Sequence, residues 1–177
     1  MTHPTPRDLH ELLAEFSAAD AMTVAHGLIS LRPTAHLAEL ANGTRVHTWC
    51  ALDTLIVAHL LETDVEVRSR TPIESAGDPI LNVAIRGGEL VADPGFILSF
   101  PHVTDGEGHH FTEAFCPYAN LFASMDAYRD WAAGQPRPTT PLTVAEADDI
   151  ARAYALDVLG RGAAEASCGA AATGCAS

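Results

Sequence analysis

The 177-residue chain contains no lysine: its ten basic residues are all arginine, against 23 acidic residues, and its formal net charge is −13. So negative a chain lacks the basic footprint that binding to nucleic acid or to anionic lipid needs. No apolar run reaches the roughly 20 residues of a membrane span, because the longest, 49–61, contains Asp53 and His59. The first residues also lack the pattern of a secretory signal. We therefore expect a soluble, cytoplasmic protein that binds neither nucleic acid nor membrane.

Cysteine is scarce, and common metal and nucleotide motifs are absent. The four cysteines are Cys50, Cys116, Cys168 and Cys175, and no CxxC, HExxH or zinc-finger spacing includes them. GxGxxG, GxxxxGK and GxSxG are missing too, so nothing points to a nucleotide site or to an α/β-hydrolase. Without an export signal, the cysteines are expected to be free thiols and not disulfides.

Turn residues and alternating apolar positions predict a mostly antiparallel sheet. Asn42-Gly43 predicts a tight turn with positive φ angles between strands at 36–40 and 45–48. Gly87-Gly88 predicts a second hairpin. Further extended segments are expected at 65–69, 80–86, 89–92 and 96–100, with a polar loop at 105–110. Segment 111–122 can be strand or helix, although its proline argues against an uninterrupted helix.

Capping residues and 3.6-residue periodicity predict the helices. Thr5-Pro6 opens one near the N-terminus, and the apolar run 49–61 forms another. Ser124 caps a short helix through Trp131. Thr143 and Glu146 form a capping box for a last helix, 144–159, whereas 21–31 is hard to assign. The predicted fold class is α+β, a mostly antiparallel sheet flanked by helices.

The chain divides by composition into three parts. Residues 1–26 are expected to be a short helical segment, 27–160 the folded domain, and 161–177 a flexible Ala/Gly/Cys tail that buries too little surface to order itself. A content of 47% hydrophobic and 19% charged residues is enough for the core of one domain.

Cys50 and Asp53 form the most informative local pattern. A helix that begins near Trp49 places Cys50 in its first turn, where the helix dipole favours a thiolate. Asp53 follows three residues later on the same face, and a carboxylate in an apolar helix is costly unless it is used. A cysteine in such a helix is more often a small core residue, and a first-turn acid often only complements the dipole. The local pattern alone favours these structural roles.

Two longer blocks resemble the organomercurial (alkylmercury) lyase family. HTWCALDTLIVAHLLE, at residues 47–62, contains the family's WCALDTL block, and EAFCPYANLFAS, at 113–124, resembles its second cysteine block, which is followed by a helix with a tryptophan, here Trp131. Gly27-Leu28 and the hairpin before Trp49 fit the same pattern. The resemblance covers 27–159, and it implies an alkylmercury-lyase-like catalytic domain at 27–160.

The resemblance implies a reaction and a set of residues for it. Cys50 and Cys116 are then the thiols that capture organic mercury, and Asp53 is the carboxylate that relays a proton to the departing carbon. The products are a hydrocarbon and Hg(II), which small thiols or a mercuric reductase remove. No cofactor is implied.

Three departures from the family pattern bear on this assignment. Only about 26 residues precede Gly27, where family members carry a longer helical region. The stretch 68–71 lacks a cysteine that many members have, and Pro117 follows the second cysteine. Two alternatives therefore stay open: a non-catalytic protein that binds Hg or Cu through the same cysteines, and a family member recruited to another substrate.

The remaining candidates are weaker. Cys168 and Cys175 can act as a flexible relay for Hg(II) or can be incidental, and the absence of a metal-site context favours the second reading. His47 and His59 are expected to be structural, and His109-His110 to bind at most an adventitious metal. Trp49 and Phe115 are expected to pack against the thiols and exclude water.

Overall fold

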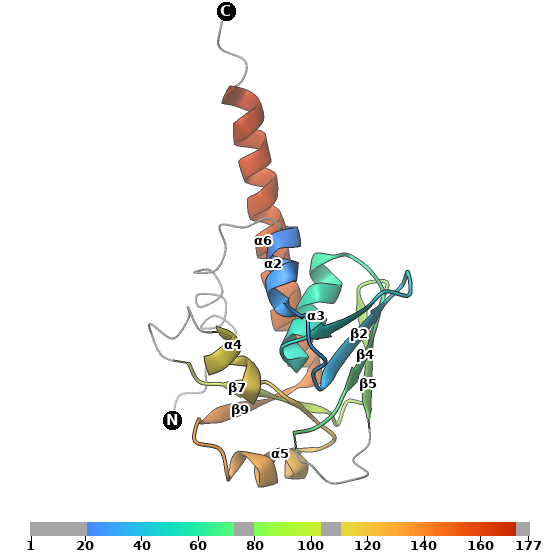
Figure 1. The fold of residues 1–177 in the computed structure, drawn as a ribbon, viewed down its shortest axis with the longest axis vertical. Helices are drawn as coiled ribbons and strands as arrows, with labels where there is room; N and C mark the ends of the chain where they lie inside the picture. The colour runs from blue at the N-terminus through green and yellow to red at the C-terminus, as the bar shows by residue number, and fades with distance from the viewer. Residues whose placement is uncertain (1–20, 73–79, 104–110, 173–177) are drawn as a thin grey trace, which may run out of the picture.

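The computed structural model describes residues 21–72, 80–103 and 111–172. Its helices are α2 (Ala21–Leu28), α3 (Ala51–Leu60), α4 (Phe111–Ala114), the 3₁₀ helix η2 (Cys116–Tyr118), α5 (Met125–Ala132) and α6 (Val144–Ala172). Its strands are β1 (Ile29–Ser30), β2 (His36–Leu40), β3 (Arg45–Thr48), β4 (Val65–Ser69), β5 (Leu81–Arg86), β6 (Glu89–Val91), β7 (Ile97–Pro101), β8 (Leu121–Phe122) and β9 (Thr139–Thr143). The α+β class is confirmed (Figure 1).

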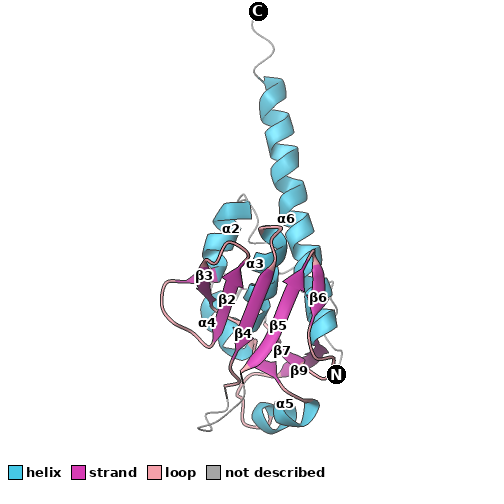
Figure 2. Cartoon of the chain, turned by 90° about the vertical axis from the view of Figure 1, so that its right-hand side faces the viewer, coloured by secondary structure: helices cyan, strands magenta, loops and turns pink. Residues whose placement is uncertain are grey.

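The larger sheet has six antiparallel strands in the order β1-β3-β2-β4-β5-β6. Figure 2 shows its strands side by side, with α3 and α6 behind them. Both predicted hairpins are present, and Gly87 and Gly88 have the positive φ angles of a tight turn. In the first hairpin four residues, and not two, connect the strands, and the Gly43 N–H donates a hydrogen bond to the Leu40 carbonyl. Of these connecting residues only Gly43 has a positive φ. The predicted turn is right in position and wrong in type.

Helix α3 lies in the middle of the core. It has apolar residues around its whole circumference and packs between the six-stranded sheet, α2 and α6, so nine of its ten residues are buried. At its far end, His59 Nε2 lies 2.7 Å from a carboxylate oxygen of Asp148 on α6. This buried pair fixes α3 against α6 and confirms a structural role for His59.

The smaller sheet has the strand order β8-β7-β9. The second cysteine segment directly precedes its short strand β8 in the chain. Helix α5 covers this sheet through an aromatic cluster in which Phe122, Tyr128 and Trp131 pack together. The Ser124 hydroxyl accepts a hydrogen bond from the Ala127 N–H, so the predicted cap of α5 is confirmed.

Three predicted boundaries differ from the structure. Helix α3 begins at Ala51 and not at Trp49, so Cys50 is the residue that precedes it. Segment 111–122 contains α4, η2 and β8, with Pro117 in the first turn of η2. The Thr143–Glu146 capping box is present, but α6 continues past the predicted end at 159 to Ala172 (Figure 1). Alanine is the best helix former, and its abundance after 160 extends the helix without a core.

Other predictions fall outside the described residues. These are the helix opened by Thr5-Pro6 and the loop at 105–110. The division into parts at 26 and 160 stays a prediction. None of the helices that the structure describes is long and apolar enough to cross a membrane.

Candidate active site

Cys50 stands at the N-terminus of α3, where the chain turns from strand β3 into the helix. Its backbone is extended, with φ −146° and ψ 173°, and its side chain is completely buried. The Thr48 hydroxyl donates to the Cys50 carbonyl at 2.9 Å, which fixes this corner. The thiol therefore points into the protein from a rigid position.

Cys116 approaches the same point from the other sheet. It opens η2, and its side chain is 4% exposed. Phe115 before it is fully buried and packs edge-on against Phe100, with ring centroids 5.2 Å apart. One main-chain bond joins the two cysteine segments: the Ala51 N–H, at the start of α3, donates to the Ala119 carbonyl at 3.0 Å. A free N–H of the helix end is thereby satisfied and holds both thiols at one place.

Asp53 completes the cluster from the first turn of α3. Its Oδ2 accepts a hydrogen bond from the Cys50 N–H at 3.1 Å and lies 3.7 Å from Cys116 Sγ. One ligand atom from each of Cys50, Asp53 and Cys116 lies within 4.8 Å of the other two. The carboxylate is fully buried, and its Oδ1 has no hydrogen-bond partner among the described residues. A buried polar atom without a partner is rare, so this oxygen requires an explanation.

Burial sets the ionisation of the cluster. Removal from water raises the pKa of Asp53 from 3.8 to about 7, although hydrogen bonds from both cysteines partly oppose this rise. Burial also raises the pKa of the Cys50 thiol well above its usual value, helped by a hydrogen bond with Cys116 and by the nearby Asp53 charge. For Cys116, the hydrogen bond with Cys50 lowers the pKa, but burial and the Asp53 charge outweigh it and the pKa rises.

At neutral pH, the resting site therefore holds two protonated thiols beside a carboxyl group that is close to half protonated. The expectation that the helix terminus favours a Cys50 thiolate is wrong, because burial and a neighbouring carboxylate outweigh the dipole. The predicted separation of the ionisations is present, since the pKa of Asp53 is about 7 and the pKa of each thiol is raised above its usual value.

This donor set suits a soft metal centre and a proton transfer. Two sulfurs that face one point are the ligands that soft metal ions prefer, whereas hard ions prefer oxygen. A carboxyl group with a pKa near 7 can both accept and donate a proton at neutral pH. The three residues can thus hold a soft metal between sulfurs and deliver a proton beside it.

The structure also identifies supporting residues that the sequence analysis missed. The Asn120 side-chain Nδ2 donates to the Pro117 carbonyl at 3.0 Å. The backbone N–H of Asn120 donates to the Ser99 hydroxyl at 2.9 Å. His36 of β2 reaches the Asn120 side chain and also pairs with Ser69 Oγ at 3.1 Å. Burial lowers the pKa of His36 to about 4, so it stays neutral. Asn120 lies within the second cysteine block, but nothing local marked its role or that of His36, because both roles depend on contacts between distant segments.

Other predicted residues do not join the cluster. His47 Nδ1 accepts a hydrogen bond from the Thr34 N–H at 3.1 Å, which is a structural role. Phe115 is buried as expected, but Trp49 is 40% exposed and so is not the buried packing residue that we predicted. His109, His110 and Cys175 lie outside the described residues. Cys168 falls within α6, in a part of the helix whose side chains are not described.

Known proteins resemble this chain in sequence. The family model of the alkylmercury lyases matches residues 29–155. An alkylmercury lyase of Streptomyces lividans is 30% identical over 156 residues, which are 85% of this chain and 69% of that protein. One of Bacillus cereus is 33% identical over 125 residues, 70% of this chain and 55% of that protein.

A solved structure gives the same fold. The crystal structure of the mercury-bound form of MerB2 aligns with a TM-score of 0.57 and 22% identity, covering 72% of this chain and 62% of that one. The chain therefore spans between about half and two thirds of the length of these relatives.

Proposed function

The chain belongs to the alkylmercury lyase family, an enzyme family, and we propose that it cleaves the carbon–mercury bond of organomercurials by protonolysis at Cys50, Asp53 and Cys116. One observation carries the proposal: a buried carboxyl group with a pKa of about 7 and an unpartnered oxygen lies beside two buried thiols. A site that only bound metal would have no use for such an acid.

Capture of the substrate begins at Cys116. Of the two thiols it is the slightly more exposed, and it contacts Asp53 Oδ2 at 3.7 Å. Its proton passes to the Asp53 carboxylate as its sulfur displaces a small thiolate from R–Hg–SR′. Cys50 then adds its own sulfur to the mercury, and the displaced thiolate departs as a thiol with the proton of Cys50.

Cleavage follows from the position of Asp53. Two thiolate ligands raise the electron density of the carbon–mercury bond, so the carbon can accept a proton. Asp53 donates the proton it holds to that carbon, the bond electrons form the new C–H bond, and the carboxylate is regenerated. The sum is R–Hg–SR′ plus two protein thiols, giving R–H, R′SH and Hg(II) between Cys50 and Cys116.

Product release requires other thiols. A buried bis-thiolate complex of Hg(II) dissociates slowly, and exchange with small thiols or transfer to a mercuric reductase removes the ion. The steps above involve only thiol and carboxyl groups, so the proposed reaction uses no cofactor.

Hydrocarbon release from phenylmercury or methylmercury, with excess thiol, tests the proposal. Wild type is expected to release benzene or methane, measured by gas chromatography. Cys50→Ser, Cys116→Ser and Asp53→Asn are each expected to lose this activity. Asp149→Asn, which removes an exposed carboxylate of α6, is the matched control and keeps it.

The outcomes separate the alternatives. Asp53→Asn that still binds Hg(II) stoichiometrically without releasing hydrocarbon supports a proton-relay role. If wild type binds mercury and releases no hydrocarbon, the chain is a soft-metal binding protein or acts on another substrate, and the proposal is wrong.

A further inference from the structure

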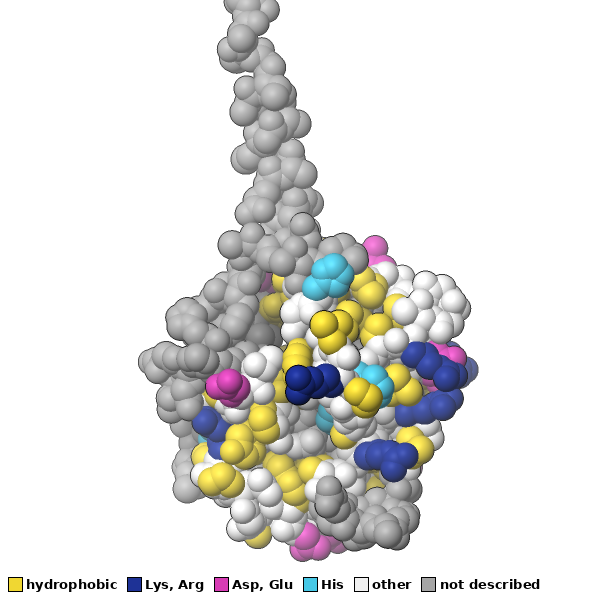
Figure 3. Space-filling view, in the orientation of Figure 1, with side chains coloured by type: hydrophobic (Ala, Val, Ile, Leu, Met, Phe, Trp, Pro, Cys, Tyr) yellow, Lys and Arg dark blue, Asp and Glu magenta, His cyan; other side chains and the backbone are white. Residues whose placement is uncertain are grey.

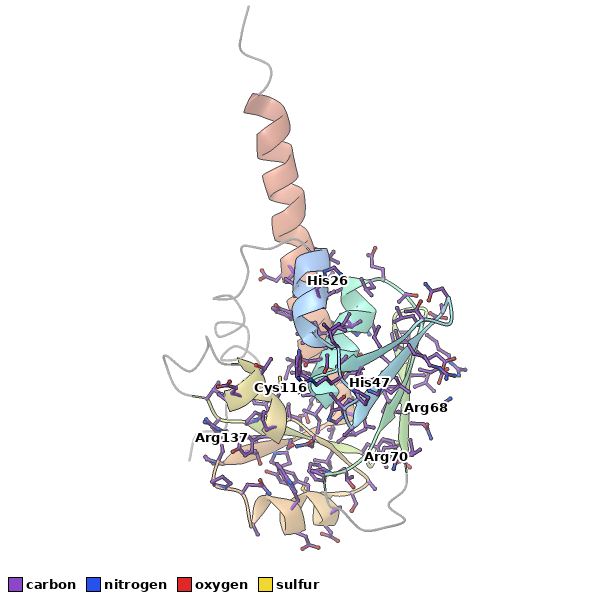
Figure 4. The ribbon with its side chains drawn as sticks, viewed as in Figure 1. His26, His47, Arg68, Arg70, Cys116 and Arg137 are labelled. Atoms are coloured by element: carbon purple, nitrogen blue, oxygen red, sulfur yellow. The ribbon has the colours of Figure 1, made fainter. Side chains whose placement is uncertain are left out.

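An open pocket of about 730 Å³ adjoins the cysteine segments. Its wall contains His26 of α2, Ile29, Leu31 and Arg32 from β1 and the following loop, Trp49, and Thr112 of α4. In the view of Figure 4, His26 on α2 lies above Cys116. The proposed reaction as described above uses none of these residues.

Two wall residues connect the pocket to the thiols through the chain. Trp49 directly precedes Cys50, and its N–H is held by the Leu28 carbonyl at the end of α2. Thr112 lies on α4, the helix that leads into Cys116. A molecule seated in this pocket therefore contacts the residue before Cys50 and the helix that precedes Cys116, although neither cysteine is among the described lining residues.

The wall offers apolar surface and a positive charge. Leu31 is 99% exposed and Trp49 40% exposed, so both leave apolar surface for a ligand to cover. Arg32 is exposed and forms no ion pair with any described residue, and none of the described residues that line the pocket is acidic. The Ser30 hydroxyl bonds both the N–H and the carbonyl of Arg32, which fixes the loop that carries it. Arginine and hydrophobic side chains adjoin on this face (Figure 3).

We propose that this pocket holds the organic group of the substrate, and that it selects an aromatic group bearing a carboxylate. The ring covers Leu31 and Trp49, the carboxylate pairs with Arg32, and the mercury atom is left toward Cys50 and Cys116. This inference rests on the proposed lyase function and specifies its substrate class.

Turnover of phenylmercury and 4-carboxyphenylmercury, each with excess of a neutral thiol, tests the selection. Arg32→Gln is expected to lower kcat/KM for the carboxylated substrate about two- to fivefold, mainly through KM, because an exposed ion pair contributes little. Phenylmercury is expected to be unaffected. Arg32→Glu should give a larger loss, and high salt should remove the difference between substrates because it screens exposed charges.

Arg68 provides the matched control. It is an exposed arginine of β4, also without an ion pair to a described residue, and it does not line the pocket. Arg68→Gln and Arg68→Glu are expected to leave the preference intact. Equal losses of kcat/KM for the carboxylated substrate at both positions would mean that the overall positive potential of this surface attracts anions. That result overturns the proposal.

A second arm identifies the source of the carboxylate. The small thiol bound to the mercury can itself have a carboxylate. Wild type and Arg32→Gln are therefore also compared with phenylmercury and a carboxylated thiol. If Arg32→Gln lowers kcat/KM only in this arm, Arg32 recognises the carrier and not the organic group, and the proposal is wrong.

A mercury-free probe separates this inference from the lyase function. Binding of 4-methylbenzoate, compared with toluene, is followed by tryptophan fluorescence, with Trp49→Phe to assign the signal. Binding that Arg32→Glu removes supports the pocket even if no mercurial is turned over. Absence of binding in wild type, with equal turnover of the two arylmercurials, refutes it.

Discussion

Replacement of Asp53 by asparagine should stabilise the protein at high pH while it abolishes activity. The fully buried carboxyl group has its pKa raised from 3.8 to about 7, so keeping it ionised in the folded state costs about 4 kcal/mol. Asparagine carries no charge and avoids this cost. It can keep one acceptor for the Cys50 N–H, but its amide donors lack an evident partner, which costs about 1–2 kcal/mol.

The sign of the pH dependence follows from proton binding. Between pH 3.8 and 7 the folded state binds more protons at Asp53 than the unfolded state, so this group lowers wild-type stability as pH rises and has no further effect above pH 7. The stability of Asp53→Asn relative to wild type should therefore increase by about 3 kcal/mol from pH 5 to pH 8.

Other buried groups do not obscure this difference. His36, with its pKa lowered to about 4, makes the folded state more stable as pH rises from 4 to 6.5, but both proteins contain it and its effect cancels. The pKa of each buried cysteine lies above its usual value, so the thiols stay protonated over this range.

Urea unfolding at pH 5, 6, 7 and 8 measures the effect, with Asp149→Asn as the control. The control should differ little from wild type at each pH, because it changes an exposed side chain that is not part of the site. A pH-independent difference for Asp53→Asn as well would mean that Asp53 titrates normally, and would refute the reasoning that makes it an acid near pH 7.

Three further predictions concern the supports of the site and the tail. Asn120→Ala should lower kcat by between about 10- and 100-fold with little change in KM, because the second thiol loses its fixed position, and an unchanged kcat would contradict this. His59→Ala should destabilise the protein by about 3 kcal/mol in urea unfolding, since it leaves buried Asp148 with only its weaker contact to Arg152; a change below 1 kcal/mol would show that the pair is unimportant. Deletion of 162–177 should slow release of Hg(II) in the absence of added thiol if the tail cysteines act as a relay, and unchanged release would exclude that role.

The sheet could be predicted from the sequence because its signals are local. In β4, alternate residues are buried, and this alternation is already visible as Val65, Val67 and Ser69 between charged residues. Gly87-Gly88 and the Ser124 cap likewise act within a few residues. The extension of α6 to Ala172 was missed because a tail without a core was expected to be disordered, whereas alanine favours helix on its own.

The site could be predicted only in part. Cys50 and Asp53 lie in one helix turn, so their proximity follows from the sequence, but Cys116 is 63 residues from Asp53 and was assigned through family resemblance. Their meeting depends on the bond from the Ala51 N–H to the Ala119 carbonyl and on the Asn120 side chain, and neither leaves a local signal. The protonated state of Cys50 was also missed, since burial is a property of the whole fold.

A single turnover of phenylmercury in D₂O, without added thiol, tests the central claim most directly. Thiol and carboxyl protons exchange with solvent, so protonolysis at Cys50, Asp53 and Cys116 predicts benzene with one deuterium, released in step with the appearance of Hg(II) bound to the two thiols. Cys50→Ser should release none. Wild type that retains phenylmercury intact, or a Cys50→Ser variant that releases benzene at the same rate, would contradict the account.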